Sequence, residues 1–313
     1  MRAKLVAWTM LTILMLPIAA KAQGRFPQLG NAEALKRILA QEPKLPAWAR
    51  MLATPLPQTT AAMLRLDFVH RAQNPLDPIL RAKIRWSAAD AIGCDYSKRV
   101  AAFDLRSSGL ARPAAQQFLE TGEAYSPKEE AALKMARKLT TAGHSVTDKD
   151  MAALMKHYGA KTVVAIVHTV AHANFQDRIF LALGVKNEKD GPYPPLNLQT
   201  KRSRKRTRPD RQPWKEVQAG NKEKAKFEPG WKERSFDKLK KALADQRKRK
   251  SRIELPKSNR SRVNWNTVGM VYQPKLTRAW FNCMNTYFRE SDVNRVFANS
   301  MFWVVTRSNE CFY

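Results

Sequence analysis

The sequence predicts an all-α protein with a helical first part, a basic connecting segment and a second helical part. Between residues 31 and 185, apolar residues recur at spacings of three and four, as on one face of a helix. Helix start and stop signals flank several of these stretches. No stretch alternates between apolar and polar residues as a half-buried strand would. With 313 residues, 44% of them hydrophobic, the chain is long enough for two ordinary domains.

The first 22 residues have the pattern of a secretory signal peptide. Two basic residues, Arg2 and Lys4, precede an apolar stretch over residues 5–20, and Ala20-Lys21-Ala22 is a small-x-small sequence typical of a cleavage site. The alternative is an uncleaved membrane anchor, but the apolar stretch is shorter than the roughly 20 residues that span a bilayer, and Pro17 interrupts it. We therefore expect a protein exported to the periplasm or secreted, with cleavage near Ala22.

Residues 31–190 are expected to form one helical domain. Ser126, Pro127 and Glu129 supply the N-cap, the first-turn proline and the capping-box glutamate of one helix. Thr147 opens the next helix, which ends near Gly159. Residues 160–184 are apolar almost all round, so they are predicted to form the central buried helix.

Residues 191–263 are predicted to be a basic, largely disordered linker. From 201 to 263, 24 Lys and Arg stand against 8 Asp and Glu, a net charge of 24 − 8 = +16 out of the chain's +29. Residues 231–250 could form a charged helix, but the rest lacks the apolar residues of a core. Its basic runs could neutralise nucleic-acid phosphates. Because no aromatics are interleaved, we prefer attraction to an anionic cell-surface polymer or lipid and do not expect nucleic-acid binding.

Residues 264–313 are predicted to begin a second copy of the first domain. Both windows show a proline, a helix, a polar break, a second helix and then Cys-x-Tyr, and they align without a gap. The first copy reaches Cys-x-Tyr at Cys94 and Tyr96, and the second at Cys311 and Tyr313. A constant offset of 217 residues pairs Pro57 with Pro274, Thr60 with Thr277, Ala62 with Ala279, Trp86 with Trp303, Cys94 with Cys311 and Tyr96 with Tyr313.

Cys94 is predicted to lie at the start of a helix. The pattern predicts that one helix ends at Gly93 and that Asp95 or Ser97 caps the next, which runs to Leu105. Free N–H groups and the helix dipole at that point would lower the pKa of the thiol. A thiolate formed in this way can attack a peroxide or a disulfide.

The region from about residue 45 to 185 resembles the AhpD-like alkylhydroperoxidases and carboxymuconolactone decarboxylases, a family of small all-α proteins that oligomerise. The likeness includes Cys94 and Tyr96, and also Asn174-Phe175 and Arg178 followed by Ala-Leu-Gly. Peroxidase members carry Cys-x-Tyr-Cys at a helix start, with a histidine one turn after the second cysteine and a glutamate upstream of the first. The resemblance implies thiol-dependent peroxidase or disulfide oxidoreductase activity, a peroxide or disulfide substrate, and a homo-oligomer.

Three partners of the family motif are missing around Cys94. The second cysteine position holds Ser97, the histidine position Ala101 and the glutamate position Ala82. In the peroxidase members the glutamate and histidine relay a proton to the thiols, and the second cysteine resolves the sulfenic acid formed on the first. The first domain therefore cannot run a dithiol cycle alone. Cys94 is either a single reactive thiol or a small buried remnant of a lost site.

Cys311 is the better candidate for the reactive thiol. In the family motif a second cysteine would come directly after Tyr313, and we predict that the natural gene supplies it. Two alternatives remain open. Both units could be a non-catalytic oligomerising scaffold that presents the basic linker to an anionic surface, or the protein could be a decarboxylase-like lyase, which needs a histidine or carboxylate near Cys94.

The remaining histidines and cysteine receive plainer interpretations. His168 and His172 share a helix face, as metal ligands often do, but the sequence places no Glu or Cys to complete a site, so we expect neither a metal nor another cofactor. His70 and His157 are placed at the surface or core edge, and His144 on the surface. Cys283 is expected to be buried as a small hydrophobe.

Overall fold

All regular elements that the computed structural model describes are helices, which confirms the predicted all-α class. The structure describes residues 26–41, 43–198, 237, 240–241, 244–245, 248, 252–255 and 265–309. The predicted signal peptide, most of the linker and the Cys311–Tyr313 motif lie outside these residues. No helix among the described residues is long and apolar enough to cross a membrane.

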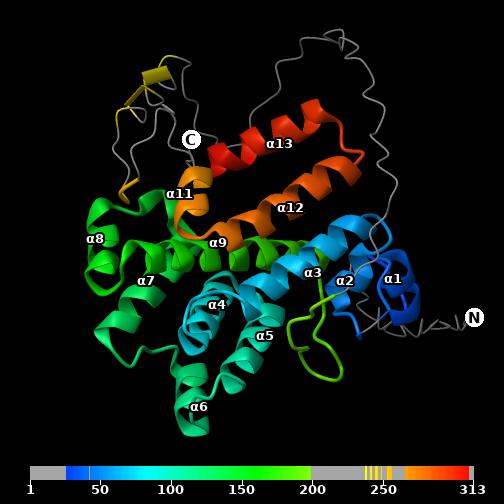
Figure 1. Cartoon of the computed structure of the whole chain (residues 1–313), viewed down its shortest axis with the longest axis horizontal. Helices are drawn as coiled ribbons and strands as arrows, with labels where there is room; N and C mark the ends of the chain where they lie inside the picture. The colour runs from blue at the N-terminus through cyan, green and yellow to red at the C-terminus, as the bar shows by residue number, and fades with distance from the viewer. Residues whose placement is uncertain are drawn as a thin grey trace, which may run out of the picture.

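The helices fall into a longer first series and a shorter second series (Figure 1). The first is α1 (Asn31–Arg37), α2 (Ala47–Leu52), α3 (Pro57–Ala72), α4 (Pro78–Ile92), α5 (Asp95–Arg106), α6 (Arg112–Thr121), α7 (Pro127–Ala142), the 3₁₀ turn η1 (Gly143–Ser145), α8 (Asp148–His157) and α9 (Ala160–Leu183). The second is α11 (Trp265–Tyr272), α12 (Pro274–Glu290) and α13 (Arg295–Ser308).

The predicted helix caps are present in α7 and α8. The Ser126 side chain accepts a hydrogen bond from the N–H of Glu129 at the start of α7. At the start of α8, Thr147 and Asp150 form a reciprocal capping box. Each cap satisfies N–H groups that have no partner inside the helix and contributes about 1 kcal/mol.

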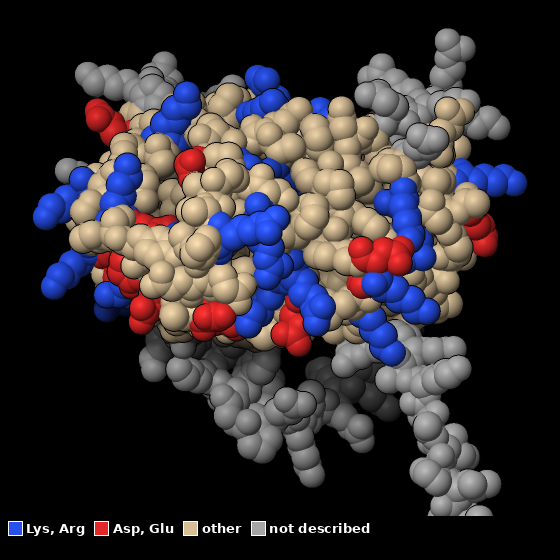
Figure 2. Space-filling view, turned by 90° about the horizontal axis from the view of Figure 1, so that it is seen from below, with Lys and Arg blue, Asp and Glu red and all other residues tan. Residues whose placement is uncertain are grey.

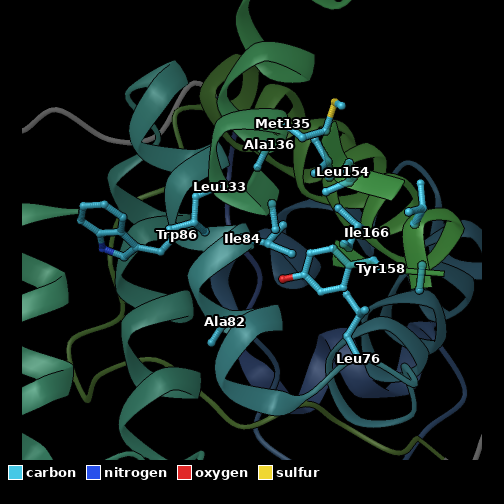
Figure 3. Packing of buried hydrophobic residues seen from close by; sticks show 14 of the residues in the cluster. Leu76, Ala82, Ile84, Trp86, Leu133, Met135, Ala136, Leu154, Tyr158 and Ile166 are labelled. Carbon is cyan, nitrogen blue, oxygen red and sulfur yellow. The ribbon is translucent and has the colours of Figure 1, made fainter. Parts of the chain in front are cut away.

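The helix α9 is central and buried, as its apolar sequence predicted (Figure 1). It packs against α4 and α7, and the three helices form the main apolar core. Figure 3 shows Ile84 of α4 and Leu133 of α7 in the same core as Ile166 of α9. Full burial of side chains of this size stabilises the fold by about 1.5–3 kcal/mol each.

A second apolar cluster joins the first helices to α12. It contains residues of α1, α2 and α3, Cys94 and Tyr96 at the start of α5, Phe180 of α9, and Cys283 of α12. Trp280 of α12 packs edge-on against Phe175 of α9, with ring centroids 5.0 Å apart. The second helix series is therefore docked on the first through apolar contacts.

The helices α3 and α12 lie side by side and antiparallel. Glu290, the last residue of α12, accepts hydrogen bonds from the N–H groups of Gln58 (2.7 Å) and Thr59 (2.6 Å) in the first turn of α3. The carboxylate thus caps the start of α3 and lies where the helix dipole favours negative charge. The C-terminal end of one helix is held at the N-terminal end of the other.

The starts of α3 and α12 have the same local structure. Each has a proline in its first turn, and the preceding residues, Leu56 and Gln273, have φ and ψ of −142° and 61°, and of −138° and 61°. Thr60 and Thr277 are both fully buried, and each donates its hydroxyl to the carbonyl four residues earlier, at 2.7 and 2.8 Å. These likenesses support the predicted repeat, which stays a prediction because its closing Cys-x-Tyr lies outside the described residues.

The predicted counterparts α4 and α13 differ in their surroundings. α4 is covered by α5, α7 and α9, whereas α13 lies on the outside beyond α12 (Figure 1). Large apolar side chains of α13 are consequently exposed, among them Phe297, Met301, Phe302, Trp303, Val304 and Val305.

Candidate functional site

Cys94 lies at the junction of α4 and α5, as predicted. Gly93 ends α4 in the left-handed conformation, with φ 72°, and Cys94 itself is the N-cap residue of α5. Its side chain makes no capping hydrogen bond, and the residue is only 1% exposed. The start of α5 is therefore placed as the sequence indicated, but its thiol is enclosed.

The predicted lowering of the Cys94 pKa is wrong. Burial raises the pKa of the thiol above its ordinary value, and the side chain and backbone of Ser97 oppose this effect only in part. The negative charges of Asp177 and Asp95 raise the pKa further. The thiol form is therefore favoured at neutral pH, even though the sulfur lies at a helix N-terminus.

Ser97 of α5 lowers the pKa of both the Cys94 thiol and the Asp177 carboxyl group, against the effect of burial. Asp177 belongs to α9 and is 1% exposed, and burial raises the pKa of its carboxyl group to about 6, although Ser97 and the positive charge of Arg85 act in the opposite direction. The Oδ2 atom of Asp177 has no hydrogen-bond partner among the described residues.

The two alanines at the family's acid–base positions are packing residues. Ala82 and Ala101 are both buried in the main apolar core. Neither methyl side chain can transfer a proton. That the first domain cannot run the dithiol peroxidase cycle alone stays a prediction.

Tyr96, the third residue of Cys-x-Tyr, contacts the segment that follows α9, at Glu188. Its hydroxyl donates a hydrogen bond to Glu188 at 3.0 Å, and its ring packs edge-on against Phe180. Burial, followed by the charge of Glu188, raises the pKa of Tyr96 well above its ordinary value. Glu188 also accepts from the N–H of Ala47 and pairs with Arg50. Tyr96 therefore has a structural role in this domain.

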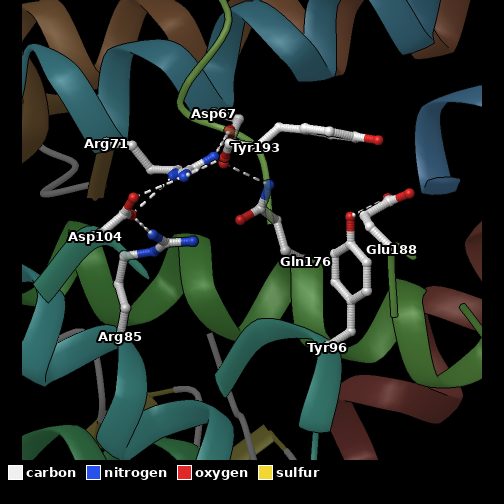
Figure 4. A network of polar contacts seen from close by, with 8 residues as sticks. All are labelled: Asp67, Arg71, Arg85, Tyr96, Asp104, Gln176, Glu188 and Tyr193. Carbon is white, nitrogen blue, oxygen red and sulfur yellow. Dashed lines mark hydrogen bonds and ion pairs between the residues drawn. The ribbon is translucent and has the colours of Figure 1, made fainter. Parts of the chain in front are cut away.

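A buried ionic network lies on the other side of Tyr96 (Figure 4). Arg71 of α3 donates two hydrogen bonds to Asp104 of α5, at 2.7 and 2.9 Å, and one to Asp67 at 3.0 Å. Arg85 of α4 donates to the same Asp104 at 2.6 Å, and Gln176 of α9 donates to Asp67 at 3.0 Å. Burial alone would lower the pKa of Arg71, but the two carboxylates raise it. The network joins four helices around one small cavity.

That cavity has a volume of about 20 Å³ and is lined by residues that include Arg85, Ser97 and Gln176. A water molecule needs about 10–15 Å³ of such space. The cavity therefore has room for water or for a molecule of similar size, such as hydrogen peroxide. It has no room for a lactone or an organic hydroperoxide.

The histidines form a buried group, and the sequence indicated its α9 members, His168 and His172, but not His70. His70 and His172 stack with their ring centroids 4.1 Å apart, and none of their four ring nitrogens has a partner among the described residues. Burial lowers the pKa of both rings well below the ordinary value, and that of His168 to about 4. The surface or core-edge position expected for His70 is wrong, because it lies on the buried face of α3 with Met63 and Leu66. His144 is exposed, as expected, and His157 is half-buried.

No group of three or more His, Cys, Asp or Glu in the described part of the chain is placed to hold a metal ion. Cys283 is buried, as expected, at 5% exposure. Burial alone raises the pKa of its thiol to about 12. Cys311 and Tyr313, the other predicted site residues, lie outside the described residues.

Sequence reasoning missed Asp177. Its place in the sequence suggested no role, whereas the fold buries it in α9, where Ser97 of α5 acts on the pKa of its carboxyl group. One signal was available. An aspartate within a helix that is otherwise apolar almost all round is costly unless it has a buried partner, so such a residue points to a polar site.

Comparison with known proteins gives a structural likeness. No family model matches the chain, and no curated protein matches it. The structure is similar to an uncharacterized peroxidase-related protein from Ralstonia eutropha JMP134, described as an alkylhydroperoxidase AhpD core. The two share 21% sequence identity and a TM-score of 0.46, over 53% of this chain and 93% of that one. The description of that protein names the family that the motif around Cys94 resembles. The function of this chain is inferred below from its own residues.

Proposed function

We propose that the chain is a thiol-dependent oxidoreductase of the AhpD-like type in which Cys311, rather than Cys94, carries the peroxide or disulfide chemistry. The observation behind this proposal is the state of the first site. Cys94 is enclosed and its partners are replaced by Ser97, Ala82 and Ala101. The same local structure at the starts of α3 and α12 supports a second unit in which Cys311 stands where Cys94 stands in the first.

The proposed reaction at Cys311 has two steps. The thiolate sulfur attacks one oxygen of a hydroperoxide, an S–O bond forms as the O–O bond breaks, and the alkoxide leaves and takes up a proton. A second thiol then attacks the sulfenic acid, giving a disulfide and water. A dithiol reductant returns the disulfide to two thiols.

Peroxide consumption by three full-length proteins tests this assignment. The parent, Cys311→Ser and Cys94→Ser would be assayed with hydrogen peroxide, an organic hydroperoxide and a dithiol reductant. We expect the parent and Cys94→Ser to consume peroxide at similar rates and Cys311→Ser to lose most of the activity. Equal rates for the parent and Cys311→Ser would rule the proposal out.

A non-catalytic scaffold is the second candidate, and one observation favours it. Apolar packing between α3 and α12 and the Glu290 cap join the two helix series. This assembly does not require Cys94 or Cys311 to be reactive. Absence of any Cys311-dependent turnover, together with a defined oligomer in sedimentation, would favour the scaffold. The buried carboxyl group of Asp177 acts on Cys94, but the cavity beside Ser97 is too small for a lactone, which disfavours the lyase alternative.

A further inference from the structure

A groove with a volume of about 400 Å³ lies between the neighbouring helices α3 and α12 (Figure 1). This volume falls in the range of sites that bind small molecules, about 300–1,000 Å³. The groove shares no residue with the small cavity at Ser97. Its lining combines apolar and basic side chains and contains no Asp or Glu: Ala62, Arg65, Val69, Pro274, Lys275, Arg278, Ala279 and Asn282.

Small apolar side chains form the floor of the groove. On α3, Ala62, Arg65 and Val69 are spaced by three and four residues and therefore share one helix face. Ala62 and Ala279 pack at the edge of the second apolar cluster, and Val69 is 3% exposed. Because methyl groups are short, the two alanines leave open a space that larger side chains would fill.

Three basic side chains line the groove without a carboxylate partner. Lys275 and Arg278 of α12 are exposed, and their side chains have no hydrogen bond or ion pair to any described residue. Arg65 of α3 donates to a neutral group, the amide oxygen of Asn197, at 2.9 Å. By contrast, ion pairs on α1, α5 and α7 join basic side chains to carboxylates. The groove therefore carries uncompensated positive charge.

We propose that this groove binds the anion of a fatty acid, with its carboxylate at the basic side chains and its alkyl chain on the apolar floor. A small inorganic anion would gain nothing from the floor, and a neutral lipid would gain nothing from the charges. The site involves neither Cys94 nor Cys311, so it goes beyond the redox function proposed above.

The basic residues suit a carboxylate. The guanidinium groups of Arg65 and Arg278 can each donate two parallel hydrogen bonds to one, and Lys275 adds a compact charge. Pro274 and Lys275 also lie in the first turn of α12, where the helix dipole favours negative charge.

The length of the groove suits an alkyl chain. Its lining on α12 runs from Pro274 to Asn282, which is about 12 Å of helix at 1.5 Å per residue. An extended chain of medium length is similar. A ligand placed in this way contacts both α3 and α12, so its binding should stabilise the docking of the second helix series on the first.

Isothermal titration calorimetry of the full chain with octanoate, octanol and acetate tests the proposal. Octanoate has both the charge and the apolar chain, whereas octanol lacks the charge and acetate lacks the chain. We expect octanoate to saturate one site per chain, and octanol and acetate to bind about tenfold or more weakly. Octanoate should also raise the temperature at which the protein unfolds.

Variants separate the role of the charges from that of the floor. Lys275→Gln combined with Arg278→Gln should weaken octanoate binding about tenfold and leave octanol binding unchanged. Ala279→Leu fills the groove and should weaken the binding of both compounds. Thermal unfolding checks the fold of each variant, and Ala62→Leu fills the groove from the other helix if Ala279→Leu does not fold.

Lys134→Gln combined with Lys156→Gln is the matched charge control. Both residues are exposed, on α7 and α8, and neither lines the groove. This variant loses the same charge as the double variant of α12 and should bind octanoate as tightly as the parent does. An equal loss of affinity in the two double variants would mean nonspecific attraction and would overturn the proposal.

Three other results would also overturn it. The first is the absence of saturable octanoate binding by the folded parent, and the second is octanol bound as tightly as octanoate. The third is a short acidic peptide, tetraglutamate, bound in preference to octanoate, which would assign the groove to a protein partner. No cysteine lines the groove, so failure here leaves the peroxide-consumption test of Cys311 unaffected.

Discussion

At Cys94 two effects act on the same sulfur in opposite directions. The dipole and free N–H groups of α5 favour the thiolate, typically by 0.3–1 kcal/mol and at most about 2 kcal/mol. Removal of the sulfur from water disfavours the thiolate, and this is the largest effect on the group. Burial therefore outweighs the dipole, and the pKa is raised. The local sequence predicts the dipole, but the burial depends on α9, more than 60 residues away along the chain.

Asp177 leads to a prediction about stability and pH. Its pKa is about 6 in the folded protein against 3.8 when unperturbed, so the folded state binds this proton more tightly than the unfolded state. The resulting stabilisation is complete below pH 3.8 and is lost as pH rises to 6. We expect Asp177→Asn to gain about 3 kcal/mol relative to the parent between pH 4 and pH 7, which is the shift of about 2 units at 1.36 kcal/mol each.

Denaturant unfolding of the parent and Asp177→Asn at several pH values measures this difference. The buried histidines contribute equally to both proteins, so their effect cancels in the comparison. Asp292→Asn is a suitable control, because this residue is exposed on the segment after α12. A constant stability difference across the range would show that Asp177 titrates normally.

At the scale of elements, the helices with strong local signals were predictable, and the partners of each helix were not. The caps at Ser126 and Thr147 and the central helix follow from residues close together in the sequence. The burial of His70 depends on α9, whose His172 stacks against it. No residue close to His70 in the sequence predicts that contact. The role of Tyr96 likewise depends on Glu188, 92 positions away.

Gly269 in α11 leads to a prediction about the second helix series. A Cβ atom there would lie 2.5 Å from the Thr277 hydroxyl oxygen and 3.1 Å from Nε2 of His168. The hydroxyl is fixed, because Thr277 donates it to the carbonyl of Gln273. Glycine to alanine normally stabilises a helix by up to about 1 kcal/mol, but overpacking costs about 1–3 kcal/mol. We expect Gly269→Ala to lower stability by about 1–2 kcal/mol.

Thermal or denaturant unfolding followed by tryptophan fluorescence would detect this loss. Met270→Ala on the neighbouring, partly exposed position of α11 is the matched control and should change stability little. A Gly269→Ala protein as stable as the parent would mean that α11 does not pack on Thr277 and His168 in solution.

At the scale of the whole molecule, the described helices and the linker differ in charge. On the face shown in Figure 2, Lys and Arg are interspersed with Asp and Glu. More than half of the net charge of +29 comes instead from residues 201–263, which carry +16. We therefore propose that this segment, rather than the helical surface, attracts an anionic polymer or lipid at the cell surface, where an exported protein would meet it.

Heparin chromatography tests that proposal. The parent should elute only at raised salt, because each neutralised charge releases counterions. A variant with the basic residues of 201–208 and 246–252 changed to glutamine should elute much earlier. Substituting a similar number of lysines and arginines on the helices is the control, and an equal effect there would remove the special role of the linker.

Glu290 has a further consequence for how the molecule opens. Its carboxylate holds the N–H groups of Gln58 and Thr59, which lie 232 and 231 positions earlier in the chain. First-turn amides of a helix normally exchange quickly with solvent deuterium, because they have no partner inside the helix. These two amides should exchange slowly while α12 is docked and quickly once it detaches. Exchange at Gln58 and Thr59 therefore measures how often the second helix series separates from the first.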